Sequence, residues 1–205
     1  MEVKGEGKQP EDTSKFRILT ASGVYVNFVN PVVDSIRIFD IAHGLSNECR
    51  YAGQCREFYS VGQHCVLASY FVPNALAWEA LFHDSSEAYL KDLPTWLKQL
   101  LPGYKEIEHR FETVIRQKFG LSTDPVVWER NKKIIKEVDY KLLATEKRDL
   151  LPVDGECWEY LRDVSPMPFN ITPWSPKEAE KRFLDRYEEL KGIYERVKIS
   201  AAIAA

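Results

Sequence analysis

The sequence predicts an all-α fold, a bundle of helices that carries a small N-terminal β-hairpin. From about Ser35 onward the apolar residues recur mostly at helical spacing, with proline and glycine at the breaks. Before that point, residues 17–29 (RILTASGVYVNFV) alternate around a Ser-Gly turn signal, the pattern of a hairpin. With 205 residues and 44% hydrophobic content, the chain is long enough for one substantial core.

Both ends are expected to lie outside that core. Residues 1–15 are polar and rich in Lys, Glu and Gly, so they bury too little apolar surface to offset the entropy of ordering. Residues 198–205 are interpreted as a frayed end. The predicted organisation is a disordered tail over 1–15, a single domain over 16–197 and a C-terminal tail over 198–205.

Six segments have the apolar period of helices, and two stretches between them, CRYAGQCREFYS and VSPMPFNITPWSP, are irregular. Ser60 is a suitable N-cap for the second helix, and the third is apolar around most of its circumference, which predicts a central position. The predicted helices are 38–46, 60–72, 74–90, 103–119, 125–150 and 176–197.

Composition excludes several classes of function. The formal net charge of −3 offers no basic excess for a nucleic-acid backbone or an anionic membrane. Four cysteines without a C-x-x-C pair indicate reduced thiols rather than a secreted disulfide scaffold. No stretch approaches the ~20 apolar residues of a membrane span, so we expect a cytoplasmic protein. The five tryptophans are interpreted as core and interface residues rather than a base-stacking platform.

Ionisable groups occur on stripes that otherwise face the core. His83, Asp84 and Glu87 share the inward arc of the third predicted helix. His64 lies on the apolar side of the second helix, and Asp139 on the apolar stripe of the fifth. Because an unpaired buried carboxylate costs several kcal/mol or gives up its charge, these groups need partners or a metal.

Two imidazoles and two carboxylates, from His64, His83, Asp84 and Asp139, have the types and number that hold one divalent metal with positions left open. This donor set favours Mn²⁺, Co²⁺, Fe²⁺, Ni²⁺ or Zn²⁺ over Ca²⁺, and Mg²⁺ stays open. Helical neighbours point ~100° apart, so His83 and Asp84 can chelate together only if the metal lies against the helix between them. Glu87 would overhang that metal.

The order H…HD…D formed by these four residues resembles the HD-domain metal-dependent phosphohydrolases. The run HDSSEAYLKDLP is similar to the HD-x-x-E-x-x-x-x-D-[LI] segment of the branch that includes bacterial 5′-deoxynucleotidases. The upstream IAHGLSNECRYAGQCREFYSVGQH resembles small HD hydrolases of bacteria and phages, including phage dATP triphosphohydrolases. The resemblance covers roughly residues 17–151 and implies an HD-domain helical bundle.

The resemblance also implies roles. By the resemblance, the metal ligands are His64, His83, Asp84 and Asp139. Glu87 is the residue that handles the attacking water, and Asp92 matches an acid implicated in catalysis. The resemblance places Arg50 on the substrate phosphate and sugar, and Tyr51 at an adjoining aromatic position of the pocket. Gln63 stands where relatives often carry Glu, so no role transfers there. Because relatives form dimers or larger rings, a homo-oligomer is expected.

Structural alternatives accompany these roles. Glu87 can instead orient His83, Asp92 can cap the turn before Pro94, and Arg50 can form an ordinary surface ion pair. His43 is interpreted as a hydrogen-bonded structural histidine.

Two further residues are not assigned to the site. His109 is expected to face solvent. Glu146 lies on nearly the same stripe as Asp139, so it is either buried with a partner such as Arg148 or peripheral, and no catalytic role is assigned to it.

The leading hypothesis is a metal-dependent phosphohydrolase of (deoxy)nucleotides, either a 5′-deoxynucleotidase or a dNTP triphosphohydrolase. One alternative is a hydrolase of a signalling nucleotide, (p)ppGpp or a cyclic nucleotide. Another is a non-catalytic, metal-stabilised helical module that binds nucleotides.

Overall fold

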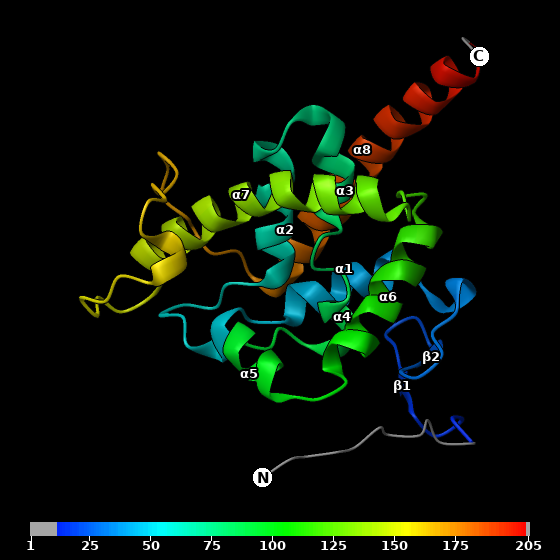
Figure 1. Ribbon diagram of the computed structural model, residues 1–205, viewed down its shortest axis with the longest axis horizontal. Helices are drawn as coiled ribbons and strands as arrows, with labels where there is room; N and C mark the ends of the chain where they lie inside the picture. Colours follow the sequence, from blue (N-terminus) through cyan, green and yellow to red (C-terminus); the bar gives the residue numbers. More distant parts are fainter. Residues whose placement is uncertain (1–11, 204–205) are drawn as a thin grey trace.

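The computed structural model describes the backbone of residues 12–203 and the side chains of residues 12–196. Within that range the protein is mostly helical with a small antiparallel hairpin, which confirms the predicted fold class (Figure 1). Strand β1 (Arg17–Leu19) pairs with β2 (Tyr25–Asn27), with Ile18 opposite Val26. Most of the tail expected over residues 1–15 lies outside the described residues.

Four of the six predicted helices match the observed ranges to within one residue at each end, and short 3₁₀ turns lie before or between the α-helices. The α-helices are α1 (Ile38–Asn47), α2 (Val61–Phe71), α3 (Ala77–Leu81), α4 (Glu87–Leu90), α5 (Thr95–Leu100), α6 (Tyr104–Lys118), α7 (Pro125–Leu150) and α8 (Pro176–Ile203). The 3₁₀ turns are η1 (Val33–Ser35), η2 (Tyr51–Gly53), η3 (Asn74–Leu76) and η4 (Glu159–Leu161).

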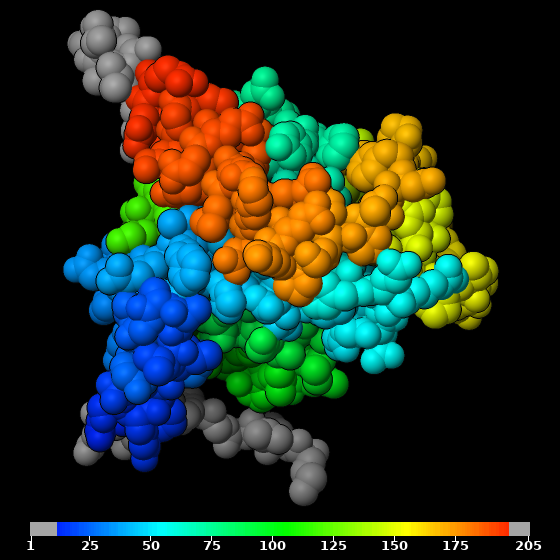
Figure 2. Space-filling model, turned by 180° about the vertical axis from the view of Figure 1, so that it is seen from behind, coloured from blue at the N-terminus to red at the C-terminus, as the bar shows by residue number. Residues whose placement is uncertain are grey.

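Helix α2 lies at the centre of the bundle, where it packs against α1, α3, α7 and α8. Most of its residues are buried, including the polar Gln63 and His64. Helix α8 and the segment before it, in orange and red, cover the upper part of the face shown in Figure 2. Among the described residues, no helix has the length and apolar character that crossing a bilayer requires.

Two helix starts follow from local chemistry. The Ser60 side chain accepts a hydrogen bond from the Gln63 backbone N–H, as expected for the N-cap of α2. Asp124 accepts from the N–H groups of Val126 and Val127, and Pro125 occupies the first turn of α7, where its missing N–H is harmless. These caps fix the ends of the helices that carry His64 and Asp139.

The single helix predicted over residues 74–90 is wrong. Tight turns over residues 82–86 separate α3 from α4. The Nδ1 of His83 lies 2.7 Å from the Ala80 carbonyl, and the backbone N–H groups of Ser85 and Glu87 bond three residues back rather than four. Serines compete for backbone hydrogen bonds and weaken a helix here. The tightened backbone changes the directions of the side chains expected from a regular helix.

Two other differences concern the ends of elements. Helix α5 was not predicted, because its short apolar run was not recognised between two prolines. Helix α8 continues to Ile203, beyond the end expected at residue 197, and its last turns extend past the neighbouring helices in Figure 1.

Gly44 permits the close approach of α1 to α4. A Cβ at this position would lie 2.8 Å from the backbone oxygen of Ala88 and 2.9 Å from its Cβ. Gly44→Ala should therefore reduce the free energy of unfolding by about 1–3 kcal/mol, measured by urea denaturation. Gly192→Ala is the control, because its Cβ would meet nothing nearer than 3.7 Å and helix propensity favours alanine. Equal stabilities of the two variants would contradict this packing role.

Candidate metal centre

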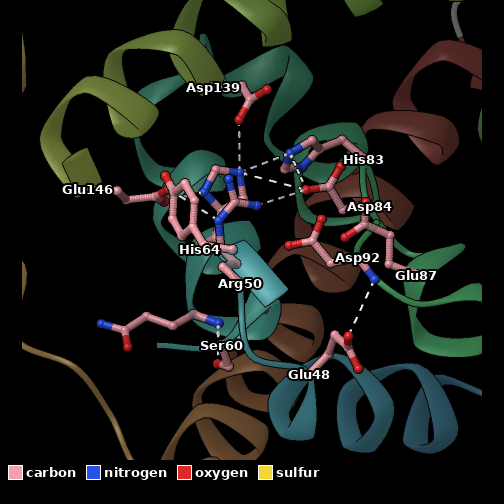
Figure 3. Close-up of polar contacts among 12 residues, drawn as sticks. Glu48, Arg50, Ser60, His64, His83, Asp84, Glu87, Asp92, Asp139 and Glu146 are labelled. Carbon is pink, nitrogen blue, oxygen red and sulfur yellow. Dashed lines mark hydrogen bonds and ion pairs between the residues drawn. The ribbon is translucent and has the colours of Figure 1, made fainter. Parts of the chain in front are cut away.

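Three separate segments bring the four predicted ligands together. His64 comes from α2, His83 and Asp84 from the turn between α3 and α4, and Asp139 from α7. Figure 3 shows these side chains pointing toward one another.

The nitrogen and oxygen atoms of these four side chains lie close to one another. The Nε2 atom of His64 lies 3.2 Å from Nε2 of His83, 3.1 Å from Oδ1 of Asp139 and 3.7 Å from Oδ2 of Asp84. The same Asp84 oxygen lies 3.2 Å from His83 Nε2, a closeness that the broken helix permits.

The hydrogen bonds of the two imidazoles fit a bound cation. His83 Nδ1 donates to the Ala80 carbonyl, which can only accept. His64 Nδ1 lies 2.6 Å from the Glu146 carboxylate and donates to it. In the neutral rings both Nε2 atoms then present lone pairs, which repel at 3.2 Å unless a proton or a metal lies between them. Such outer hydrogen bonds are typical of metal-ligating histidines.

Glu146 is a fully buried common acceptor behind His64. Its carboxylate accepts hydrogen bonds from Tyr51 at 2.6 Å, from Tyr59 at 3.0 Å and from Arg50 Nε at 3.1 Å. The alternative that pairs Glu146 with Arg148 is wrong, because Arg148 bonds Asp149 and nearby carbonyls. Glu146 therefore orients the histidine and the Arg50 segment together.

The environment lowers the pKa of three carboxyl groups. Burial alone would raise the pKa of Asp84, yet the charge and hydrogen bond of His83 hold it well below the usual range. Against the same burial, His64 and Lys136 depress the pKa of Asp139. Arg50 and His64 likewise lower the pKa of Glu146 to about 2. These groups are carboxylates at neutral pH and can face a cation.

The same environment raises the pKa values of the two imidazoles, His64 and His83. Burial lowers the pKa of each ring, but Glu146 and Asp139 raise that of His64, and Asp84 raises that of His83 well above its ordinary value. Without a cation between them, these rings are therefore drawn toward protonation.

Two other carboxyl groups of the site, those of Glu87 and Asp92, have raised pKa values. Burial, followed by the charges of Asp84 and Asp92, raises the pKa of Glu87 well above its ordinary value. Burial also raises the pKa of Asp92, and Arg50 only partly opposes it. Glu87 Oε1 lies 3.3 Å from Lys98 Nζ, whereas Oε2 is buried without a hydrogen-bond partner among the described residues.

Two cavities meet at this centre, and Asp84, Glu87 and Asp139 line both. The first, of about 350 Å³, lies toward α6 and includes Trp128 and Lys132. The second, of about 390 Å³, is lined by Arg50 and Tyr51 among other residues and is called the Arg50-side cavity below.

Aromatic side chains line the Arg50-side cavity. They are Tyr51, Trp96, Tyr140, Trp158 and Tyr160, and Asp92 lines the same space. Trp96 is 65% exposed, so the interpretation of every tryptophan as core or interface misses its position at this cavity.

Arg50 and Tyr51 line the second cavity. Arg50 is buried, with NH1 3.6 Å from Asp84 Oδ2, so it is no ordinary surface ion pair. Tyr51 and the following Ala52 adopt positive φ values of 56° and 51°, a conformation that disfavours side chains with a Cβ. The hydrogen bond from Tyr51 to Glu146 holds this strained turn against the centre.

The remaining histidines lie apart from the site. His43 Nδ1 bonds Glu180 at 2.8 Å, as a structural histidine would. His109 is exposed, as expected, and its ring stacks on Trp128.

Sequence patterns missed Glu146, Lys98, Lys136 and Tyr59 as parts of the site. The position of Glu146 two turns after Asp139 was a usable signal, because a carboxylate on a buried stripe needs partners. Lys98 and Lys136 are ordinary lysines in the sequence, and only tertiary structure places their ammonium groups at the cavities.

Comparison with known proteins places the chain in a family. It is 44% identical over 174 residues to the uncharacterised protein YfdR of Escherichia coli K12, covering 84% of this chain and 94% of that protein. This chain belongs to the YfdR family. An uncharacterised protein of Rhodobacter capsulatus is 34% identical over 110 residues, or 49% of this chain and 56% of that protein. No protein-family model matches the chain. Neither relative's name states an activity.

The buried charge of Glu146 predicts a pH-dependent stability. Its pKa is lowered from 4.5 to about 2 on folding, so its stabilising contribution is complete above the unfolded pKa and is lost as pH falls through the folded value. Glu146→Gln should lower the free energy of unfolding by on the order of 3 kcal/mol at neutral pH. The difference in the free energy of unfolding between this variant and the parent, measured by urea denaturation, should become smaller below about pH 4.5.

The exposed Glu106, on α6, is the matched control. Glu106→Gln should leave the free energy of unfolding and its pH dependence unchanged. If the Glu146→Gln protein is as stable as the parent at neutral pH, the hydrogen bonds and charges around Glu146 make no net contribution to the free energy of unfolding.

Proposed function

We propose that this protein is a divalent-metal-dependent nucleotide phosphohydrolase of the HD-domain type. The observation that carries the proposal is the convergence of His64, His83, Asp84 and Asp139 where two cavities meet. Two imidazoles and two carboxylates suit Mn²⁺, Co²⁺, Fe²⁺, Ni²⁺ or Zn²⁺, and the cavities leave room for a phosphate ester.

A cation held there would lower the pKa of a bound water and polarise a phosphate oxygen. Glu87 is the group proposed to take a proton from the attacking water, because a raised pKa makes its carboxylate a stronger base. Asp92, whose pKa is also raised, is proposed to protonate the leaving oxygen. Both side chains line the Arg50-side cavity.

The substrate is proposed to be a nucleotide that enters from the Arg50 side. Arg50 directs NH1 toward Asp84 at 3.6 Å, so its guanidinium can donate to a phosphate oxygen at the centre. Aromatic residues of the same cavity, Tyr51 among them, offer flat apolar surfaces for a sugar and base. The products are a nucleoside with phosphate or, when water attacks the α-phosphorus of a dNTP, with triphosphate.

A substrate and metal screen tests the proposed reaction. Nucleoside and deoxynucleoside mono-, di- and triphosphates are incubated with Mn²⁺, Co²⁺ or Mg²⁺, and chromatography identifies phosphate, triphosphate and nucleoside. We expect hydrolysis that a chelator abolishes and added metal restores. The panel includes (p)ppGpp and cyclic nucleotides, and exclusive turnover of these would replace the proposal with the signalling alternative. Failure to hydrolyse any compound would favour the non-catalytic module.

Two variants separate metal binding from proton transfer. Asp84→Ala should lose bound metal, measured by elemental analysis after dialysis, together with activity. Glu87→Gln should retain metal and lower turnover by about 10²–10⁴-fold, because the amide cannot accept the proton. Glu106→Gln again serves as an exposed control. Normal turnover by Glu87→Gln would contradict its assignment as the base.

A further inference from the structure

A thiol lies beside the proposed centre and has no part in the proposed mechanism. Cys65 follows His64 on α2 and is fully buried. Its Sγ atom, a His83 ring nitrogen and an Asp84 carboxylate oxygen lie within 4.8 Å of one another. Cys65 is thus one member of a three-residue cluster, and that cluster shares His83 with the group formed by His64, His83 and Asp139.

The spacing of the cluster suits a shared cation. Donor atoms bonded to one metal at about 2.0–2.3 Å lie roughly 3–4.6 Å apart, so three donor atoms within 4.8 Å of one another have nearly the spacing that a shared cation requires. His83 and Asp84 lie in the irregular turn between α3 and α4 rather than within a rigid helix. Small changes in their side-chain torsions can therefore favour one ligand group or the other.

The two groups differ in chemical softness. The group with His64 and Asp139 presents only nitrogen and oxygen donors, which Mn²⁺ accepts without a sulfur ligand. The group with Cys65 adds sulfur, which Zn²⁺, Co²⁺ and Cd²⁺ bind more strongly. Binding there replaces an S–H bond with a sulfur–metal bond and releases the proton to solvent, with no change of oxidation state.

We propose that Cys65, His83 and Asp84 form a second, softer ligand set that draws thiophilic cations away from Asp139. The inference rests on the proposed metal centre and deepens it by assigning metal selectivity to one residue. Cations held by sulfur are displaced from the position that serves hydrolysis, so Cd²⁺ should bind tightly and inhibit, whereas Mn²⁺ activates.

Absorption spectroscopy of the full-length, metal-free protein tests the ligand directly. Titration with Co²⁺ should produce visible d–d bands together with a sulfur-to-cobalt charge-transfer band in the near ultraviolet. Cys65→Ser should keep the d–d bands and lose the charge-transfer band. Its Cd²⁺ affinity should fall about 10–100-fold, with Mn²⁺ affinity unchanged. The exposed Cys157 gives the matched control, Cys157→Ser, which should behave like the parent.

The outcomes separate this inference from the proposed function. Parent protein that binds Co²⁺ with d–d bands but no charge-transfer band retains a metal centre and overturns the role of Cys65. A charge-transfer band that persists in Cys65→Ser also overturns it. If the parent binds no metal at all in equilibrium dialysis, the metal centre and the proposed function both fail. Should Cys65→Ser misfold by circular dichroism, the ¹¹³Cd resonance of the parent decides, because a sulfur ligand shifts it strongly downfield.

Discussion

The buried carboxylate of Glu146 is the interaction on which the arrangement of the site depends. A charge in such a position costs several kcal/mol unless hydrogen bonds and opposite charges surround it. Here Tyr51, Tyr59, Arg50 and His64 all bond it, from the loop before α2 and from α2 itself, while Glu146 belongs to α7. Satisfying one carboxylate therefore fixes α7 against α2 and the loop before it, which lie 82–96 residues away in the sequence.

The same interaction explains the strained backbone beside Arg50. The positive φ values of Tyr51 and Ala52 are unfavourable for residues with a Cβ, and glycine would adopt them more easily. A tyrosine at this position gains a hydrogen bond to Glu146 and a place in the cavity wall, which glycine could not supply. The strain is held because the surrounding bonds determine the geometry, as is common at binding sites.

Sequence patterns predicted the fold class and named four residues that the structure brings together, but they did not give the geometry of that group. Helix α7 was predicted with the bounds observed, because Asp124 and Pro125 mark its start and the apolar period runs to Leu150. A helical wheel placed His83, Asp84 and Glu87 in one arc, yet the chain turns tightly there and the wheel does not apply. Apolar period alone does not register the hydrogen bond from His83 Nδ1 that accompanies the break.

The partners that set charge could not be predicted, because they come from other elements. Lys98 reaches Glu87 and Glu108 from α5, a helix with no clear period in the sequence. The resemblance named residues and roles, whereas the distances among them required tertiary structure.

The division of the carboxyl groups into two classes links this geometry to chemistry. Groups beside the imidazoles and Arg50 stay ionised and can balance a divalent cation, whereas Glu87 and Asp92 lie where burial and like charge favour the proton. Environments that separate pKa values in this way assign acid and base roles within one site. Lys98 moderates the effect on Glu87, because an ammonium at 3.3 Å favours the ionised form against burial. Glu87, held between these influences, is the carboxylate proposed to accept the proton of the attacking water.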